Sequence, residues 1–308
     1  MYKALVVGCG NIGALYDLDN DSVKTHTKAF SKNKLIELWI FDSDKKLSKK
    51  IAEKYSCHIL NEITSDELKK FDLVSICVPT NYHIQYLNIL LKINTKIIIC
   101  EKPISLIKQE LDDIQSVFLE SKSKIIVNYI RRFQPVYIYL KNNYSKYLNT
   151  ESLSEISIKY TRGFLNNVSH AFDLIEFLFD EEINLSKIKV IDKTYDVFLN
   201  DPTLSLKGEL YTKPIIITGI PHSKTTVWEI ELCFTGHKIS FSNSGNDIII
   251  TSLKNSDCTE IFHATDCIKD YMQPVIDAAV DALNNRVNTY SNFENSLLLN
   301  KKMLEYIQ

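Results

Sequence analysis

The chain has 308 residues, which is long enough for two domains of ordinary size. Hydrophobic residues make up 45% and charged residues 24%, which excludes a disordered or fibrous protein. The 36 Lys and Arg nearly balance the 38 Asp and Glu, for a formal charge of −2, and no basic patch predicts binding to nucleic acid or to a membrane.

The amino-terminal residues and the cysteines indicate the compartment. The apolar run from Leu5 to Val7 is too short for a membrane span and leads into glycines, unlike a signal peptide. The seven cysteines are odd in number, lack Cys-x-x-Cys spacing and lie mostly in apolar runs, as expected for buried free thiols. We therefore expect a cytoplasmic protein with neither a disulfide framework nor a structural metal.

The first part of the chain alternates buried strands with amphipathic helices. Short apolar runs predict strands at 5–7, 35–41, 73–78, 97–100 and 125–127, and longer patterned segments predict helices at 44–55, 82–93 and 108–121. Strand and helix in this order predict right-handed crossovers and a doubly wound parallel sheet. The expected fold class is α/β, with a first domain at 1–127.

The second part of the chain shows a different periodicity. After about residue 150 every second residue tends to be apolar, which predicts strands at 156–160, 204–211, 215–219, 226–235, 238–242 and 247–253. Helical patterns are present at 170–179, 274–284 and 293–307. We expect a second α/β domain at 128–308 with a large, mainly antiparallel open sheet, its C-terminal helices free to pack back on the first domain.

A glycine-rich turn directly follows the first strand. Residues 8–13 read GCGNIG and fit the G-x-G-x-x-G fingerprint of a Rossmann dinucleotide-binding domain. Gly8 makes the tight turn, Gly10 lets a pyrophosphate approach the backbone, and Gly13 lets the next helix pack closely. That helix presents free N–H groups to the phosphates, so Asn11 and Ile12 join the predicted cofactor site. The alternative is a glycine-rich turn without a ligand.

An acidic residue ends the second predicted strand. Asp42 follows Gly13 at a longer spacing than the usual ~20 residues, because the polar stretch 17–27 makes the first loop longer. Its carboxylate can hold the ribose hydroxyls of adenosine and repel the additional phosphate of NADP, so we expect NAD in preference, although Lys45 and Lys46 lie nearby. The alternative is that Asp42 is a turn or N-cap residue of the next helix.

Four motifs, in this order, resemble the Gfo/Idh/MocA family of sugar and cyclitol dehydrogenases. They are the fingerprint at 8–13, VPTNYH at 78–83, EKP at 101–103 and NYIRRFQP at 128–135. The resemblance implies a Rossmann domain followed by an α/β domain whose large sheet forms one wall of the substrate cleft and often an oligomer interface. We expect Pro79, Thr80, His83 and Glu101 at the cofactor site, with Thr80 capping the helix that begins near His83.

The resemblance also implies the catalytic residues. The Lys of the EKP tripeptide corresponds to Lys102, which follows a buried strand at the edge where open α/β sheets bind ligands. The family's second-domain His corresponds to His170, but Asn166 stands where the family has an Asp four residues earlier. Asn166 orients by hydrogen bonds and cannot ionise. The alternatives are a surface lysine paired with Glu101, and a helix-terminal histidine with a satisfied ring.

Three further residues are weaker candidates for the substrate site. His26 follows the long first loop and either reaches the nicotinamide or substrate or is simply exposed. Arg131 and Arg132 either bind an anionic substrate group or form interdomain salt bridges. With Asn166, these arginines favour an anionic or nucleotide-linked sugar over free inositol.

The sequence thus predicts an NAD-dependent oxidoreductase that oxidises a hydroxyl of a sugar, sugar acid or nucleotide sugar, or reduces the keto form. Two alternatives stay open: an NAD-dependent glycosidase that uses transient oxidation, and a non-catalytic dinucleotide-binding sensor or scaffold. The expected partners are the small-molecule substrate and further copies of the chain, in a dimer or tetramer formed through the second-domain sheet.

Overall fold

The computed structural model describes residues 1–253, 259–284 and 292–307. Within these ranges the chain forms two compact units, one of Met1–Ile130 with Lys269–Leu298 and the other of Arg131–Ile268 with Leu299–Gln308. The predicted division into domains at 1–127 and 128–308 stays a prediction. No helix of the described residues is long and apolar enough to cross a membrane.

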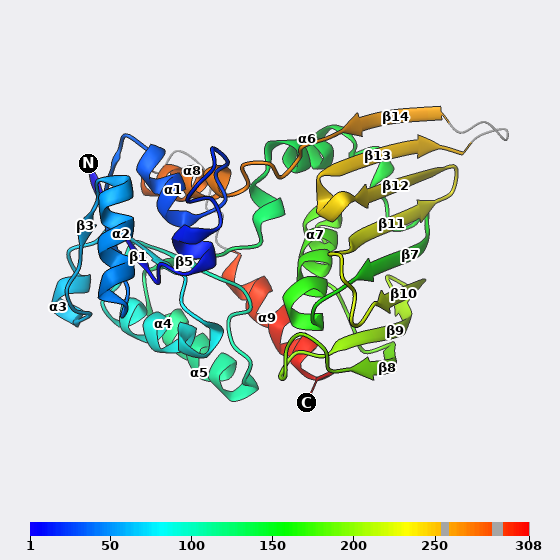
Figure 1. The fold of residues 1–308 in the computed structure, drawn as a ribbon. Helices are drawn as coiled ribbons and strands as arrows, with labels where there is room; N and C mark the ends of the chain where they lie inside the picture. Colours follow the sequence, from blue (N-terminus) through cyan, green and yellow to red (C-terminus); the bar gives the residue numbers. More distant parts are fainter. Residues whose placement is uncertain (254–258, 285–291, 308) are drawn as a thin grey trace. The chain divides into compact units, whose positions relative to one another are not determined.

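The first unit contains a six-stranded parallel sheet (Figure 1). Its strand order is β3-β2-β1-β4-β5-β6, and every neighbouring pair runs parallel. All residues of β4 and β5 are buried, as the continuous apolar runs predict. This order confirms the expected doubly wound sheet. The strands are β1 (Tyr2–Val7), β2 (Ile36–Phe41), β3 (His58–Ile59), β4 (Leu73–Ile76), β5 (Ile97–Cys100) and β6 (Lys124–Val127).

Helices connect these strands: α1 (His26–Lys32), α2 (Lys45–Tyr55), α3 (Ser65–Leu68), α4 (His83–Lys92) and α5 (Lys108–Glu120). Helix α8 (Met272–Leu283), from the C-terminal segment, belongs to the same unit. The Asp44 side chain caps α2 by accepting hydrogen bonds from the backbone of Lys46 and Leu47, and Thr25 caps α1. A helix begins at Asn11 directly after the glycine-rich turn, as expected, but it is a short π-helical segment, Asn11–Leu15, and not an α-helix.

The second unit contains an eight-stranded sheet that is antiparallel except for one pair. Its order is β14-β13-β12-β11-β7-β10-β9-β8, and β7 and β10 are the parallel neighbours. This confirms the predicted mainly antiparallel sheet, although the sequence patterns did not predict β8 and β14. The strands are β7 (Leu153–Tyr160), β8 (Ile188–Thr194), β9 (Thr203–Leu210), β10 (Lys213–Gly219), β11 (Trp228–Phe234), β12 (His237–Ser242), β13 (Asp247–Ser252) and β14 (Thr259–Ala264).

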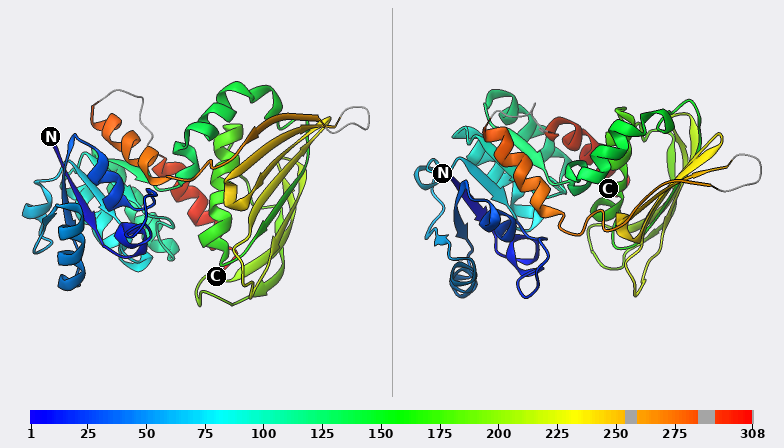
Figure 2. Two further views of the ribbon diagram at one scale, coloured as in Figure 1. Left: turned by 45° about the horizontal axis from the view of Figure 1, so that its top comes forward. Right: turned by 90° about the horizontal axis from the view of Figure 1, so that it is seen from above.

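The helix α7 (Ser169–Phe179) lies along one face of this sheet (Figure 2). Eight of its residues are buried, and the strands alternate buried with more exposed residues, so the core of this unit lies between helix and sheet. Helix α6 (Pro135–Asn143) precedes the first strand, and the last turns of α9 (Phe293–Leu304) also belong to this unit.

Candidate functional site

The carboxyl ends of the parallel strands bring the predicted cofactor residues to one edge of the first unit. The segments after β1, β4, β5 and β6 each begin with a backbone hydrogen bond to the last residue of a neighbouring strand, including Gly8 to Phe41 at 2.8 Å and Glu101 to Ile76 at 3.2 Å. Beside this edge lies a pocket of about 480 Å³. It is lined by Gly8, Gly10, Phe41, Asp42, Ser43, Cys77, Val78, Pro79, Tyr82, Gln85 and Tyr86.

The three fingerprint glycines meet three different constraints. Gly8 has φ +97°, in the region that side chains rarely adopt. A Cβ on Gly13 would lie 2.0 Å from the carbonyl oxygen of Gly8, so no side chain fits there. A Cβ on Gly10 would have no heavy atom within 4 Å among the described residues. Gly10 therefore leaves open space beside the pocket, as a pyrophosphate group requires.

Asp42 lines one wall of the pocket, and the backbone fixes its carboxylate. One oxygen accepts the N–H of Cys9 at 2.7 Å, and the other accepts the N–H of Asp44 at 2.9 Å. Asp42 therefore does take part in the turn, but Asp44 is the N-cap of α2, so the N-cap alternative for Asp42 is wrong. The ammonium of Lys45 donates to the carbonyl of Asn61 at 2.9 Å.

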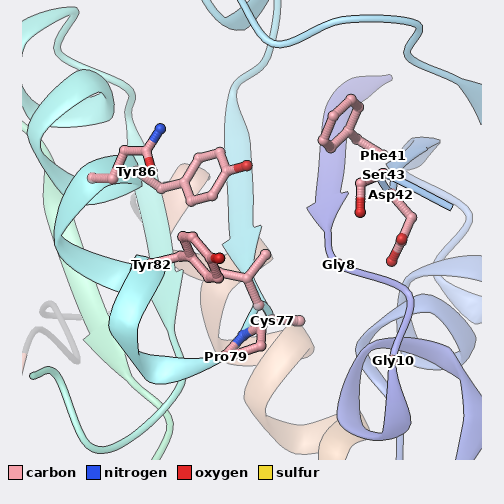
Figure 3. A pocket seen from close by; sticks show the side chains of 11 residues that line it. Gly8, Gly10, Phe41, Asp42, Ser43, Cys77, Pro79, Tyr82 and Tyr86 are labelled. Atoms are coloured by element: carbon pink, nitrogen blue, oxygen red, sulfur yellow. The ribbon is translucent and has the colours of Figure 1, made fainter.

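Two tyrosines form the opposite wall, which the sequence did not predict. Figure 3 shows Tyr82 and Tyr86, at the start of α4, facing Phe41, Asp42 and Ser43 across the pocket. Burial and the nearby Asp42 carboxylate raise the pKa of Tyr86 above its ordinary value, so this hydroxyl is neutral at physiological pH. The i, i+4 spacing of two aromatic residues at the start of a helix is the available sequence signal.

The structure differs from the predictions for Thr80 and His83. Thr80 does not cap α4: it begins a short 3-10 turn, Thr80–Tyr82, and the N-cap position of α4 is Tyr82, without a side-chain cap. His83 does begin α4, but it is 1% exposed and does not line the pocket. Its two ring nitrogens each lie 2.9 Å from a carbonyl oxygen, of Val78 and of Pro103.

Glu101 takes part in a buried hydrogen-bond network. Its carboxylate lies 2.8 Å from Nε2 of His26 and accepts the side-chain N–H of Asn128 at 2.5 Å, while Ser75 Oγ lies 2.6 Å from Nδ1 of His26. Burial alone raises the pKa of the Glu101 carboxyl, but these hydrogen bonds and the nearby Lys102 ammonium outweigh burial and lower it. His26 is 0% exposed, so the expectation of an exposed loop residue is wrong.

Lys102 lies at the carboxyl end of β5, between Glu101, which contacts His26, and Pro103, whose carbonyl faces His83. The residue is partly exposed, and its peptide bond to Pro103 is cis. The other predicted cofactor residues, Asn11 and Ile12, lie in the π-helical turn after Gly10 and do not line the pocket.

His170 and Asn166 lie in the second unit, one turn apart. His170 is partly exposed in the first turn of α7, and Asn166 lies in the preceding π-helical turn, Phe164–Val168. The buried carboxylate of Asp201 accepts the backbone N–H of Leu165 at 2.7 Å and that of Asn166 at 2.8 Å. Asp201 thus fixes the turn that carries Asn166, and an Asn-Asp-Pro turn sequence is the only sequence signal for it.

Arg131 and Arg132 both have partners within the second unit. The Arg131 guanidinium is 3.6 Å from the ring centre of Trp228 and donates to the carbonyl of Ser244 at 2.6 Å. Arg132 donates from Nε to Asp173 at 2.7 Å. These contacts favour the salt-bridge alternative for Arg132, here within one unit, and a packing role for Arg131. Their predicted role in substrate binding stays a prediction.

Comparisons with known proteins agree with this geometry. Residues 2–129 match the family model described as "Oxidoreductase family, NAD-binding Rossmann fold". Inositol 2-dehydrogenase of Rhizobium meliloti (strain 1021) is 26% identical over 61% of this chain, and the match spans 59% of the length of that relative.

Two solved structures share the fold of nearly the whole chain. UDP-N-acetylglucosamine 3-dehydrogenase of Acidithiobacillus ferrooxidans has a TM-score of 0.77 at 14% identity, covering 99% of this chain and 96% of its own. A Gfo/Idh/MocA family oxidoreductase of Vibrio cholerae has a TM-score of 0.72 at 13% identity, covering 100% of this chain and 97% of its own. At these identities the likeness shows the fold alone.

Proposed function

Because residues 2–129 match the model of the oxidoreductase family with an NAD-binding Rossmann fold, we propose that the chain is an NAD-dependent dehydrogenase acting on a hydroxyl of a sugar or cyclitol. The single observation that carries the proposal is the pocket at the carboxyl edge of the parallel sheet, with open space at Gly10 and the fixed carboxylate of Asp42 beside it. Bound NAD supplies the hydride acceptor. The protein binds and orients the reactants.

Asp42 is the proposed determinant of NAD over NADP. Its two backbone hydrogen bonds hold the carboxylate at the pocket wall, where a ribose diol can donate to it and a 2′-phosphate is repelled. Lys45 is the nearby cation that could reverse this preference. Its ammonium donates to the carbonyl of Asn61 and lies 5.1 Å from the ring centre of Phe41, so this cation stays near the same wall. The preference for NAD is therefore assigned to the Asp42 carboxylate, which lines the pocket itself.

The proposed proton-transfer residues are Lys102 and His170, with Asn166 as an orienting group. Lys102 follows β5 at the edge that carries the pocket, and His170 is partly exposed at the start of α7. The imidazole of His170 can accept a hydroxyl proton near neutral pH. Asn166 can hydrogen-bond a hydroxyl but cannot replace a carboxylate as base.

The substrate class is proposed from the names of the relatives. One curated relative is an inositol dehydrogenase, and one structural neighbour is a UDP-N-acetylglucosamine dehydrogenase, so free cyclitols and nucleotide sugars are both candidates. The contacts of Arg131 and Arg132 within their own unit weaken the sequence argument for an anionic substrate, and their role in binding one stays a prediction.

We also propose a homo-oligomer of cytoplasmic chains joined through the sheet of the second unit. Val190 and Ile191 on β8 and Ile216 on β10 are exposed apolar side chains, as at protein interfaces.

Calorimetric titration with NAD and NADP, followed by a turnover panel of cyclitols, hexoses, sugar acids and nucleotide sugars, tests the function. Wild-type protein should bind NAD more tightly, and Asp42→Asn should lose about 10- to 100-fold in NAD affinity, since a hydrogen bond to a charged group contributes about 1.5–3 kcal/mol. Asp113→Asn, an exposed change on α5, is the matched control. Equal affinity for both dinucleotides in the wild type, or no turnover with any class, would contradict the proposal.

A further inference from the structure

Buried groups bond to both residues that flank Lys102. Glu101, immediately before it, is hydrogen-bonded to His26 and Asn128. The carbonyl of Pro103, immediately after it, faces the ring of His83 at 2.9 Å. The lysine is thus a partly exposed residue whose two neighbours contact buried side chains of the first unit.

Both ring nitrogens of His26 have a polar partner. Nδ1 lies 2.6 Å from the Ser75 hydroxyl, and Nε2 lies 2.8 Å from the Glu101 carboxylate. A buried carboxylate is costly unless it is paired and hydrogen-bonded, so these partners fix both the charge and the position of Glu101. Ser75 belongs to β4 and His26 begins α1, so the network ties the end of β5 to two other elements.

His83 makes a second connection, from the other side of the tripeptide. Its Nε2 faces the carbonyl of Val78, in the loop that lines the cofactor pocket, and its Nδ1 faces the carbonyl of Pro103. The ring is 1% exposed and fills the space between the two loops. Burial lowers the pKa of His83, and the neutral ring has one N–H, which donates either to the carbonyl of Val78 or to that of Pro103. The packing of the ring between the two loops connects the pocket wall after β4 to the lysine-bearing segment after β5.

We propose that His26 and His83 are positioning residues, which clamp Glu101 and Pro103 and so hold the Lys102 ammonium in place beside the cofactor pocket. The inference rests on the proposed function, since it assigns these histidines a purpose in proton transfer by Lys102. Neither histidine contacts the reactants in this account. Each acts through the backbone and side chain that flank the lysine.

The consequence is a loss of turnover. A displacement of ~1 Å at a reacting group costs about 100-fold in rate. We therefore expect His26→Asn and His83→Asn to lower kcat by about 10- to 100-fold. The Kd for NAD should stay within about twofold in His26→Asn, whereas His83→Asn also removes the ring that faces the carbonyl of pocket-lining Val78. Ser75→Ala, which removes only the hydroxyl that orients His26, should give a smaller loss in a protein whose packing is kept.

A labelling experiment measures the lysine directly and needs no substrate. Trace acetylation with acetic anhydride across a pH series, read by peptide mass spectrometry, gives the relative reactivity of Lys102 and of surface Lys50 in the same molecule. In His26→Asn, His83→Asn and Ser75→Ala the pH profile of Lys102 should move, and that of Lys50 should not. The controls are His237→Asn, a buried histidine of the second unit, and Ser123→Ala, a buried serine just before β6.

The outcomes separate the two proposals. An unchanged Lys102 profile and unchanged kcat in folded variants overturn the clamp and leave the dehydrogenase standing. A shifted Lys102 profile in Ser75→Ala supports the clamp even if a histidine variant fails to fold. If the wild type turns over no substrate, the proposed function fails, while the labelling profile still decides whether the histidines hold the lysine.

Discussion

Replacing Gly10 and Gly13 separately by alanine should divide the fingerprint into a binding glycine and a packing glycine. Gly10 has φ −67° and ψ −159°, which alanine adopts without strain, and open space surrounds its Cβ direction. Gly13 has the Gly8 carbonyl oxygen 2.0 Å from its Cβ position. The two changes add the same methyl group. Gly10→Ala should keep the fold stable and weaken NAD binding, whereas Gly13→Ala should destabilise the fold.

The magnitudes follow from these distances. Gly10→Ala should leave the free energy of unfolding unchanged or raise it by about 0.4–1 kcal/mol, because alanine restricts the unfolded chain. The same methyl group occupies space that the pyrophosphate requires, and overpacking of about 1–3 kcal/mol lowers NAD affinity roughly 5- to 150-fold. Gly13→Ala must displace backbone, so it should destabilise the fold by about 3 kcal/mol or more.

Urea denaturation gives the unfolding free energies, and calorimetric titration gives the Kd for NAD of each folded variant. Wild type and Asp113→Asn serve as references in both assays. A Gly10→Ala protein of normal stability that binds NAD as tightly as wild type would refute the argument that the open space at Gly10 receives the cofactor. A normally stable Gly13→Ala protein would refute the packing argument.

Three further predictions concern catalysis and stability. Lys102→Ala and His170→Ala should each lower turnover by about 10²- to 10⁴-fold without loss of NAD binding, measured by steady-state kinetics and calorimetry; normal turnover in both contradicts the assignment. Asp173→Ala should destabilise the fold by about 1.5–3 kcal/mol in urea denaturation, because partly exposed Arg132 loses its partner at 2.7 Å and keeps Glu176 at 3.9 Å; a loss below about 1 kcal/mol would show that the pair is unimportant. Burial raises the pKa of Glu176 to about 7 from an ordinary 4.5, so its contribution to the free energy of unfolding is fully present below pH 4.5 and is lost as the pH rises through about 7. Glu176→Gln should flatten that part of the stability profile, and an unchanged slope would show that another group titrates there.

The first unit could be predicted closely because its strands are buried on both faces. Continuous apolar runs such as 97–100 show burial without any knowledge of neighbours, and the fingerprint at 8–13 fixes where the cofactor edge lies. The family model over residues 2–129 confirms the resemblance that those motifs predict. The edge strands β8 and β14 were missed because few of their residues are buried, so their sequences lack the apolar alternation of a half-covered strand.

The polar contacts could not be predicted, because they join residues far apart in the sequence. Nothing in the residues around His26 indicates that its ring reaches Glu101, and a histidine after a polar loop is ordinarily exposed. Arg132 likewise has its partner Asp173 on a distant helix. Propensity and periodicity describe neighbours along the chain, whereas these side chains are placed by the strand order of the sheets.

The parallel pairing of β7 and β10 constrains the order in which the second sheet can form during synthesis. Ile156 on β7 pairs with Ile215 on β10 at one edge of β7 and with Leu232 on β11 at the other edge. A nascent chain therefore carries the central strand of this sheet, with both of its edges open, until the ribosome has added the residues of β10 and β11. Such late, non-local pairing slows folding and leaves both edges of β7 exposed to pairing with other chains in the meantime.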